Sequence, residues 1–436
     1  MMMTIPIHCD VVVIGGCPAG SMVATLLNQK GYKVVLFEKK KHPGYNVGES
    51  LIPHFWKYTD LAKVAEKIAA EDFIQKAGGT VVWNGTIRQI AFKNFGYSRP
   101  ALHVERDRFD HILVEHAQSQ GAQVFEEITA LRVDLNGNDQ VNVSYRRGDE
   151  SIPDKISCRF VVDASGQSAV IAKQLGIRVV DEGFRFMSVW GYFKGSKYVA
   201  SDGKAYPFEN LRTVPPTTFV SSIGDWGWSW HIPLRESTSV GLVLPLDYLK
   251  TAKVTDEALE AYFVRKCYEI PILNRLLENA QYCEGSLHVI RDYSYLPTQL
   301  AGPGFFLIGD AAAFIDPIFS IGVVLGMYSA SIAAWAIDRS FKSPNSTSEN
   351  RDLFSNQFRA RLEVARLLAL PCYNANGSGS QLAKASIQFE RSIEQELMYV
   401  VSTVTTRSQN YLELAKTEDG RITTSDKFRI LEQIVF

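Results

Sequence analysis

The residues of this chain that could do chemistry begin with a lysine and a pair of tryptophans. Lys76 precedes a Gly-Gly pair and the apolar stretch 81–83. An isolated lysine of this kind is usually a solvated surface residue, but a buried one would have a lowered pKa and supply a nucleophilic amine. Trp228 and Trp230 stand two apart in a stretch that continues through Ile232 and Pro233. On a strand both rings would lie on one face, where they either form a rigid wall or pack in the core.

A glycine-rich loop near the N-terminus indicates a dinucleotide site. The apolar run 10–14 predicts a strand, 21–30 a helix and 33–38 a second strand. Such a loop lets the backbone approach a pyrophosphate at the helix N-terminus, while an acid ending the second strand binds a ribose. Cys17 replaces the central glycine of G-x-G-x-x-G; it is a tolerated small residue, or else it marks a redox-sensitive or weaker site. The candidate residues are Gly15, Cys17, Ala19, Gly20, Glu38 and Lys39.

Three further stretches are spaced as in the large hydroxylase-like flavoprotein family. Arg106 opens a predicted helix, and the resemblance places it near the flavin. A strand over 159–163 ends in Asp163, within a turn that resembles the family's D-A-S-G. A strand over 305–308 delivers Gly309 and Asp310 at its carboxyl end, where ligands of α/β sheets bind. An isolated Gly-Asp pair is usually an ordinary turn, but after the other elements we expect Asp310 to contact the ribityl chain.

Together these features resemble the flavin-dependent halogenases, whose motif W-x-W-x-I-P is complete here and whose active-site lysine stands in an F-x-x-K-x-G-G setting. The resemblance covers most of the first 340 residues. It implies reduced FAD (FADH2) as cofactor and chloride or bromide as co-substrate. Hypohalous acid would pass the tryptophan barrier to reach Lys76. No second nucleotide loop is evident, so a partner flavin reductase would supply the FADH2.

The stretch 316–322 suggests where a halide would bind. It leads into an uncharged helix, and the N–H groups of Ile321 and Gly322 at its start could hold a small anion. The same helix start without a halide would suit a hydroxylase equally well. Ser320 is a candidate catalytic residue. Phe319 stands where halogenases of free tryptophan carry a glutamate. In this respect the chain resembles the subgroup that acts on phenols, pyrroles or acyl groups tethered to carrier proteins. That subgroup often has the stretch F-S-S-G-V-H, from which Ile321 and Val324 depart.

The predicted fold class is α/β combined with α+β. Residues 1–180 and 285–340 would form a Rossmann-like FAD-binding domain of the hydroxylase-like type, including the Lys76 segment. Residues 181–284 would form a mainly antiparallel sheet on the substrate side, and 341–436 a C-terminal helical cap, helical over 349–370 and again over 381–405. The uncharged stretch 318–337 is long enough for a membrane span, but its glycines and serines favour a buried helix.

Composition excludes several classes of function. The chain has 436 residues and a net charge of −1, which argues against nucleic-acid binding. Its six cysteines are scattered, without zinc-ligand spacing, which indicates reduced thiols and no metal site. No signal peptide is apparent, so we expect a cytoplasmic protein.

Three other functions stay open. A flavin monooxygenase has the same nucleotide-binding elements. A flavin-dependent reductase of isoprenoid chains could also contain the apolar helix after Asp316. A flavin-binding partner protein would perform no chemistry itself. The halogenase hypothesis predicts an electron-rich aromatic substrate, a phenol or pyrrole, free or tethered to a carrier protein, in natural-product biosynthesis.

Overall fold

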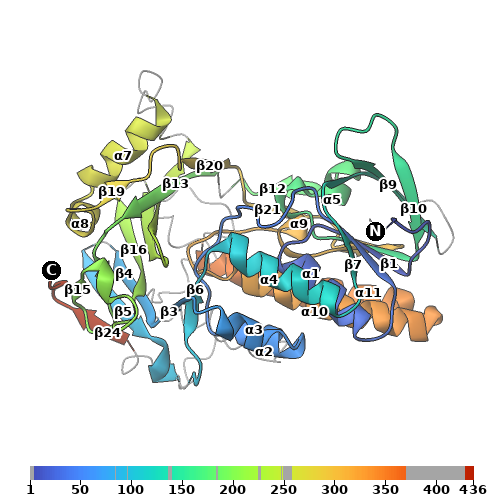
Figure 1. Ribbon diagram of the computed structural model, residues 1–436, viewed down its shortest axis with the longest axis horizontal. Helices are drawn as coiled ribbons and strands as arrows, with labels where there is room; N and C mark the ends of the chain where they lie inside the picture. The colour runs from blue at the N-terminus through green and yellow to red at the C-terminus, as the bar shows by residue number, and fades with distance from the viewer. Residues whose placement is uncertain are drawn as a thin grey trace.

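The computed structural model describes residues 4–369 and 428–436, apart from short gaps at 84, 96, 136–139, 183–184, 224–226, 247 and 249–257. Two lobes lie side by side, each built on one large β-sheet (Figure 1). The strand-helix-strand unit predicted at the N-terminus is present as β1 (Val11–Ile14), α1 (Pro18–Asn28) and β2 (Val34–Phe37).

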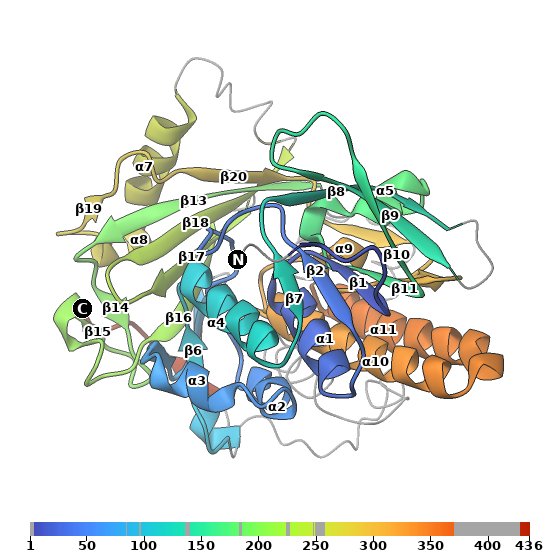
Figure 2. The ribbon, with the colours of Figure 1, turned by 45° about the vertical axis from the view of Figure 1, so that its right-hand side comes forward.

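The first lobe contains a six-stranded sheet in the order β22-β23-β11-β1-β2-β7. Its central strands are short runs of buried Val, Leu, Ile and Phe, as expected for parallel strands covered on both faces. Helices α1, α10 and α11 cover one face, and a three-stranded sheet, β10-β9-β8, covers the other (Figure 2). The remaining elements of this lobe are β7 (Gln123–Phe125), β11 (Phe160–Asp163), β22 (Ala301–Gly302), β23 (Phe305–Leu307), β8 (Ile128–Asp134), β9 (Val141–Arg147), β10 (Asp154–Cys158), α2 (Phe55–Leu61), α3 (Ala65–Ala70), α4 (Arg106–Ser119), α5 (Val170–Gln174), α9 (Gly309–Ala312), α10 (Gly322–Lys342) and α11 (Thr347–Ala369).

The second lobe contains a nine-stranded, mostly antiparallel sheet in the order β19-β13-β18-β17-β16-β4-β5-β24, with β20 pairing β13. Helices α7 and α8 pack against it in a separate hydrophobic cluster. Its elements are β4 (Gly78–Trp83), β5 (Thr86–Ala91), β13 (Phe186–Lys194), β16 (Thr217–Ile223), β17 (Gly227–Pro233), β18 (Thr238–Pro245), α7 (Leu259–Glu269), α8 (Pro271–Leu276), β19 (Gln281–Tyr282), β20 (His288–Arg291) and β24 (Phe428–Leu431). Small pairs complete the structure: β3 (Ile74–Lys76) with β6 (Ala101–His103), β12 (Arg178–Val180) with β21 (Tyr295–Pro297), and β14 (Tyr198–Val199) with β15 (Ala205–Tyr206).

Three segments lie outside the domains drawn for them from the sequence. Strand β20, drawn in the FAD-binding domain, and strand β24, drawn in the C-terminal helical region, both belong to the second sheet, through β13 and β5. Strands β4 and β5, assigned there to the FAD-binding domain, belong to the second sheet, because β4 pairs in parallel with β16. This pairing joins segments about 140 positions apart, from Gly78 with Thr217 to Val82 with Ser221, so local periodicity could not indicate it. The segment that carries Lys76 therefore links the two lobes.

The C-terminal helices are described in part. Helix α11 confirms the helical prediction for 349–369 and packs on α10 and β22 of the first lobe. The second predicted helical stretch, 381–405, lies outside the described residues. Helix α10 covers the uncharged stretch 322–337 and is largely buried, and among the described residues no helix is long and apolar enough to cross a bilayer.

Candidate functional site

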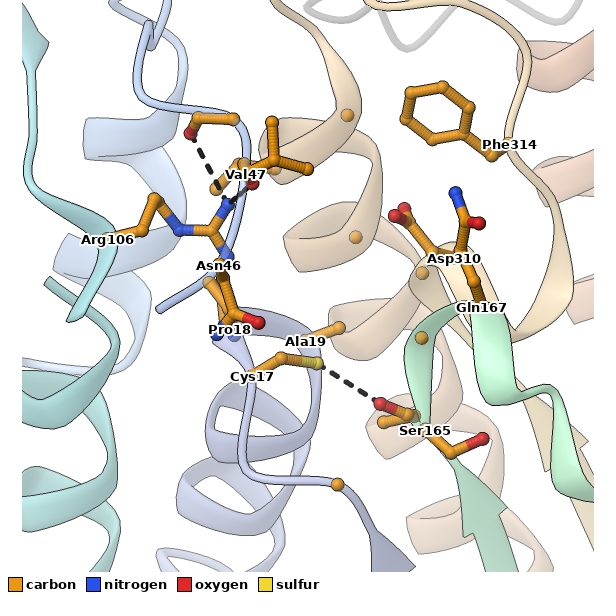
Figure 3. A pocket seen from close by; sticks show the side chains of 18 of the residues that line it. Cys17, Pro18, Ala19, Asn46, Val47, Arg106, Ser165, Gln167, Asp310 and Phe314 are labelled. Carbon is orange, nitrogen blue, oxygen red and sulfur yellow. Dashed lines mark hydrogen bonds between the residues drawn. The ribbon is translucent and has the colours of Figure 1, made fainter. Parts of the chain in front are cut away.

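A cavity of about 630 Å³ opens where the carboxyl ends of the parallel strands face β16 and β17. Its walls include the N-terminal glycine loop, the start of α4, the turn after β11 and the start of α10. In the close view Cys17, Pro18 and Ala19 form its floor, with Arg106 on one side and Asp310 and Phe314 on the other (Figure 3). The volume is in the usual range of cofactor and ligand sites.

The glycine loop has the close packing that a dinucleotide site needs. Gly15 has a φ of +104°, and a Cβ there would lie 2.4 Å from the carbonyl oxygen of Ala164. A Cβ on Gly20 would lie 1.9 Å from the carbonyl oxygen of Gly15, so Gly20 shapes the loop without lining the cavity. Cys17 precedes α1, and its Sγ lies 3.1 Å from the same Ala164 oxygen. Burial raises the pKa of Cys17 to about 12, so the thiol is not a reactive thiolate.

Glu38 and Lys39 line the cavity just beyond the end of β2. The Glu38 carboxylate accepts a 2.7 Å hydrogen bond from the backbone N–H of Gly16 and a 2.8 Å bond from that of Lys40. The loop and the acid thus position each other, and Glu38 presents its charge beside the start of α1.

Arg106 is the first residue of α4 and points at the cavity wall formed by 46–48. Its guanidinium pairs with Asp110 one turn later, at 2.8 and 2.9 Å, and also donates to the carbonyl oxygens of Val47 and Gly48. The charge of Asp110 raises the Arg106 pKa further, against the opposing effect of burial. The arrangement places a fixed positive charge next to the cavity.

The two predicted aspartates have different surroundings. Asp163, at the end of β11, is fully buried and does not line the cavity; its carboxylate accepts the N–H groups of Ser165 at 3.0 Å and Ile171 at 2.7 Å. It therefore holds the turn that borders the site. Asp310 does line the cavity, and burial raises its pKa to about 6 although Arg106 opposes the shift. Gly309 precedes it with a φ of +53°.

Lys76 ends β3 and is 3% exposed. Its Nζ donates to the Oγ of Ser50 at 2.8 Å and to the carbonyl oxygen of Leu51 at 3.0 Å, and it lies 5.4 Å from the ring centre of Phe92. Desolvation by burial lowers the pKa of Lys76 to about 7. Lys76 itself does not line the cavity, but Ser50 does, so the amine lies directly behind the cavity wall.

Ser320 and the start of α10 lie on the same part of the wall. The Oγ of Ser320 donates to that of Ser50 at 3.0 Å, so Ser50 connects Ser320 with Lys76. Ser320 has a φ of +56°, which turns the chain into α10. Gly322, the first residue of α10, lines the cavity, whereas Ile321 is buried beside it as the N-cap. The first N–H groups of a helix lack intrahelical partners and carry partial positive charge.

The two tryptophans face the cavity from β17 together with Ile232, as expected for alternate residues of one strand. Trp228 and Trp230 are 2% and 6% exposed, and their ring centres are 5.9 Å apart. Pro233 ends the strand without lining the cavity, and its carbonyl oxygen lies 2.9 Å from Nδ1 of His103. Two rigid rings of the second lobe therefore line the cavity at this point.

Several residues of the site were not predicted. Trp190 and Trp230 lie on either side of Gly241 on adjacent strands, with ring centres 6.1 Å apart, and a Cβ on Gly241 would lie 2.1 Å from Trp230. Glu49 lines the cavity, and burial raises its pKa to about 7. The others are Ser50, Thr218, His103 and Asp110. Only Asp110 had a local signal, because it stands four residues after Arg106 on the same helix face.

Comparisons with known proteins show the family to which this chain belongs. A family model described as an FAD binding domain matches residues 8–343. The tryptophan 2-halogenase of Chondromyces crocatus is 36% identical over 337 residues, which are 77% of this chain and 62% of that protein. A 1H-pyrrole-2-carbonyl-(peptidyl-carrier protein) chlorinase of Pseudomonas fluorescens is 32% identical over 77% of this chain and 76% of its own length. The myxobacterial chondrochloren halogenase CndH superposes with a TM-score of 0.76 at 27% identity, over 88% of this chain and 90% of that one.

Fold and site thus define an FAD-dependent flavoprotein. Within that class, the chain belongs to the flavin-dependent halogenase family, whose members use FAD and a halide. It spans less than two thirds of the Chondromyces relative. The residues here fit FAD: the loop has no room for a Cβ at Gly15 or Gly20, and the cavity lies at the carboxyl ends of the parallel strands, bordered by the buried Arg106.

Proposed function

We propose that this protein halogenates an electron-rich aromatic substrate and that Lys76 transfers the halogen. The observation that carries the proposal is the position of Lys76: a buried amine behind the cavity wall, bonded to Ser50, which lines the cavity and also contacts Ser320. Reduced FAD, when bound, would supply the electrons with which dioxygen and halide form hypohalous acid.

The protein's part in that step is to hold the reactants and to limit their escape. We propose that the loop residues, Glu38, Lys39, Arg106 and Asp310 hold the cofactor, with Asp163 fixing the adjacent turn. The N–H groups of Ile321 and Gly322 would hold chloride or bromide at the start of α10. The ring wall of Trp228 and Trp230, with Ile232, keeps the aromatic substrate apart from the cofactor and so prevents direct hydroxylation.

The chemistry at Lys76 follows from its surroundings. With a pKa of about 7, a substantial fraction of the side chain is the neutral amine at neutral pH. Its nitrogen lone pair attacks the halogen of hypohalous acid, the oxygen leaves with its electron pair, and the departing hydroxide takes a proton from nitrogen to form water. An aromatic carbon then takes the halogen from the N-halo-lysine while the nitrogen takes up a proton, which restores the amine, and the C–H proton of the ring passes to solvent or a base.

The residue beside Ser320 bears on the substrate class. Phe319 supplies no carboxylate there, so the aromatic ring must be reactive enough to need no strong base, as a phenol or pyrrole is. Such a substrate is either free or tethered to a carrier protein, and the Pseudomonas relative is named for a pyrrole carried in the second way. We further propose that a flavin reductase supplies FADH2. All five cysteines in the described part of the chain are free, which supports the reducing environment of the cytoplasm.

A substrate-free experiment tests the proposal. Enzyme loaded with FADH2 is mixed rapidly with oxygen in the absence of halide, with chloride and with bromide, and the flavin absorbance is followed. The proposal predicts that at least one halide accelerates the return of oxidised flavin. Rates indifferent to both halides, together with hydroxylation of an added phenol, would instead establish a monooxygenase.

A further inference from the structure

A buried histidine joins the tryptophan motif to Lys76. His103 ends β6 and is 0% exposed. Its Nδ1 lies 2.9 Å from the carbonyl oxygen of Pro233, and its Nε2 lies 2.8 Å from the Oγ1 of Thr218. Thr218 in turn lies 2.8 Å from the Oγ of Ser50, which Lys76 contacts at 2.8 Å. One continuous line of hydrogen bonds therefore runs from Pro233 to Lys76.

The donor and the acceptor of each hydrogen bond in this line follow from the carbonyl oxygen of Pro233 at its end. A carbonyl oxygen only accepts, so the Nδ1 of His103 must carry a hydrogen and donate it to Pro233. Burial keeps the pKa of His103 well below its ordinary value, and the charges of Lys76 on β3 and His231 on β17 lower it further. His103 is therefore neutral, its Nε2 has no hydrogen, and it accepts the hydroxyl hydrogen of Thr218.

The hydrogen of Thr218 also determines the directions of the remaining hydroxyl groups. Because Thr218 gives its one hydrogen to His103, it can only accept from Ser50. Ser50 thereby gives its hydrogen to Thr218 and offers only oxygen lone pairs to its other two neighbours. Both neighbours then act as donors: Lys76 at 2.8 Å and Ser320 at 3.0 Å.

We propose that His103 is a positioning residue that fixes these hydroxyl directions and thereby leaves the nitrogen lone pair of Lys76 free. A neutral amine has two hydrogens and one lone pair, and the hydrogens are taken by Ser50 and by the carbonyl oxygen of Leu51. If the line ran the other way, the Ser50 hydroxyl would donate to the amine and occupy the lone pair. The importance of a free lone pair for catalysis rests on the proposed role of Lys76.

The pKa of Lys76 itself tests this proposal without turnover. Full-length enzyme with oxidised FAD is labelled with 15N-lysine, and the Nζ signal of Lys76, identified by its loss in Lys76→Met, is followed against pH. In Thr218→Val, position 218 no longer offers an acceptor to Ser50. The Ser50 hydroxyl then donates to the Lys76 amine instead, which favours the neutral form of Lys76. In His103→Phe, the freed Thr218 hydroxyl donates to Ser50 with the same consequence. Both variants should lower the Lys76 pKa by about one unit.

Thr218→Ser is the matched control, because it keeps the hydroxyl and should leave the Lys76 pKa at the wild-type value. An unchanged pKa in folded Thr218→Val and in folded His103→Phe would overturn the proposal. The outcome is distinguishable from failure of the proposed function. If the pKa shifts as described but Lys76→Ala halogenates as fast as wild type, His103 positions Lys76 and the catalytic role of the lysine is wrong.

Discussion

Lys76 donates a 2.8 Å hydrogen bond to the hydroxyl of Ser50, and this bond connects the strand after α3 with the segment that borders the FAD cavity. The two residues are 26 positions apart in sequence. They meet because the segment around Ser50 and strand β3 lie on opposite sides of β6. The backbone of His103 in β6 forms an isolated β-bridge with Ser50 and also pairs with Ile74 of β3. Backbone pairing on the two sides of β6 thus holds Ser50 and Lys76 close together.

The Gly-Gly pair after Lys76 gives the first prediction. A Cβ at Gly78 would lie 1.8 Å from the carbonyl oxygen of Ile90, whereas a Cβ at Gly79 would meet its nearest neighbour, the Thr218 oxygen, at 3.9 Å. Gly78→Ala should therefore lower the free energy of unfolding by about 2–4 kcal/mol, and Gly79→Ala should change it by less than about 1 kcal/mol. Denaturant unfolding of both variants measures this. Equal losses would show that the contact with Ile90 does not explain Gly78.

Burial of Lys76 should reduce the stability of the fold in a pH-dependent way. Its pKa is lowered from 10.5 to about 7, so between these pH values the unfolded chain binds more protons and wild-type stability rises with pH. Lys76→Met removes this dependence. Although Lys76→Met loses two hydrogen bonds, we expect its free energy of unfolding to exceed that of the wild type by about 1–3 kcal/mol at pH 6. The gain should shrink as the pH approaches 10 in urea titrations; a gain independent of pH would contradict the lowered pKa.

Glu49 should show the opposite dependence on pH. Burial raises its pKa from 4.5 to about 7, and Tyr192 donates to its carboxylate at 2.6 Å. Between these values the folded chain binds more protons, so wild-type stability should fall as the pH rises, by roughly 3 kcal/mol in total. Glu49→Gln should flatten the stability curve between pH 4.5 and 7. Thermal unfolding at matched pH values tests this, and an equally steep decline in Glu49→Gln would refute it.

The tryptophan wall can be disturbed without touching a tryptophan. A methyl group at Gly241 would lie 2.1 Å from Trp230, so Gly241→Ala must move that ring. If the wall confines hypohalous acid, the variant should release several-fold more of it per oxygen consumed. Oxidation of free methionine in solution measures the release. Gly79→Ala, a glycine change on the same sheet with space for the methyl group, serves as the control and should resemble wild type.

Sequence and structure agree best where the information is local. The strand-loop-helix unit around Gly15, the helix beginning at Arg106 and the shared face of Trp228 and Trp230 each depend on short spacing rules. The hydroxyl line through Ser50, Thr218 and His103 could not be predicted, because its residues come from segments up to 168 positions apart and none has an informative neighbour in sequence. The same holds for β4, whose parallel pairing with β16 moves it out of the predicted domain.

The most direct test of the account asks whether Lys76 carries the halogen. Enzyme loaded with FADH2 is mixed with oxygen and bromide without aromatic substrate, in excess free methionine to consume escaped oxidant, and desalted rapidly. Oxidising equivalents kept by the protein are then titrated with a thiol. We expect close to one equivalent per chain for wild type and for Lys93→Ala, an exposed lysine. Lys76→Ala should keep none while still consuming oxygen; retention equal to wild type would contradict the account.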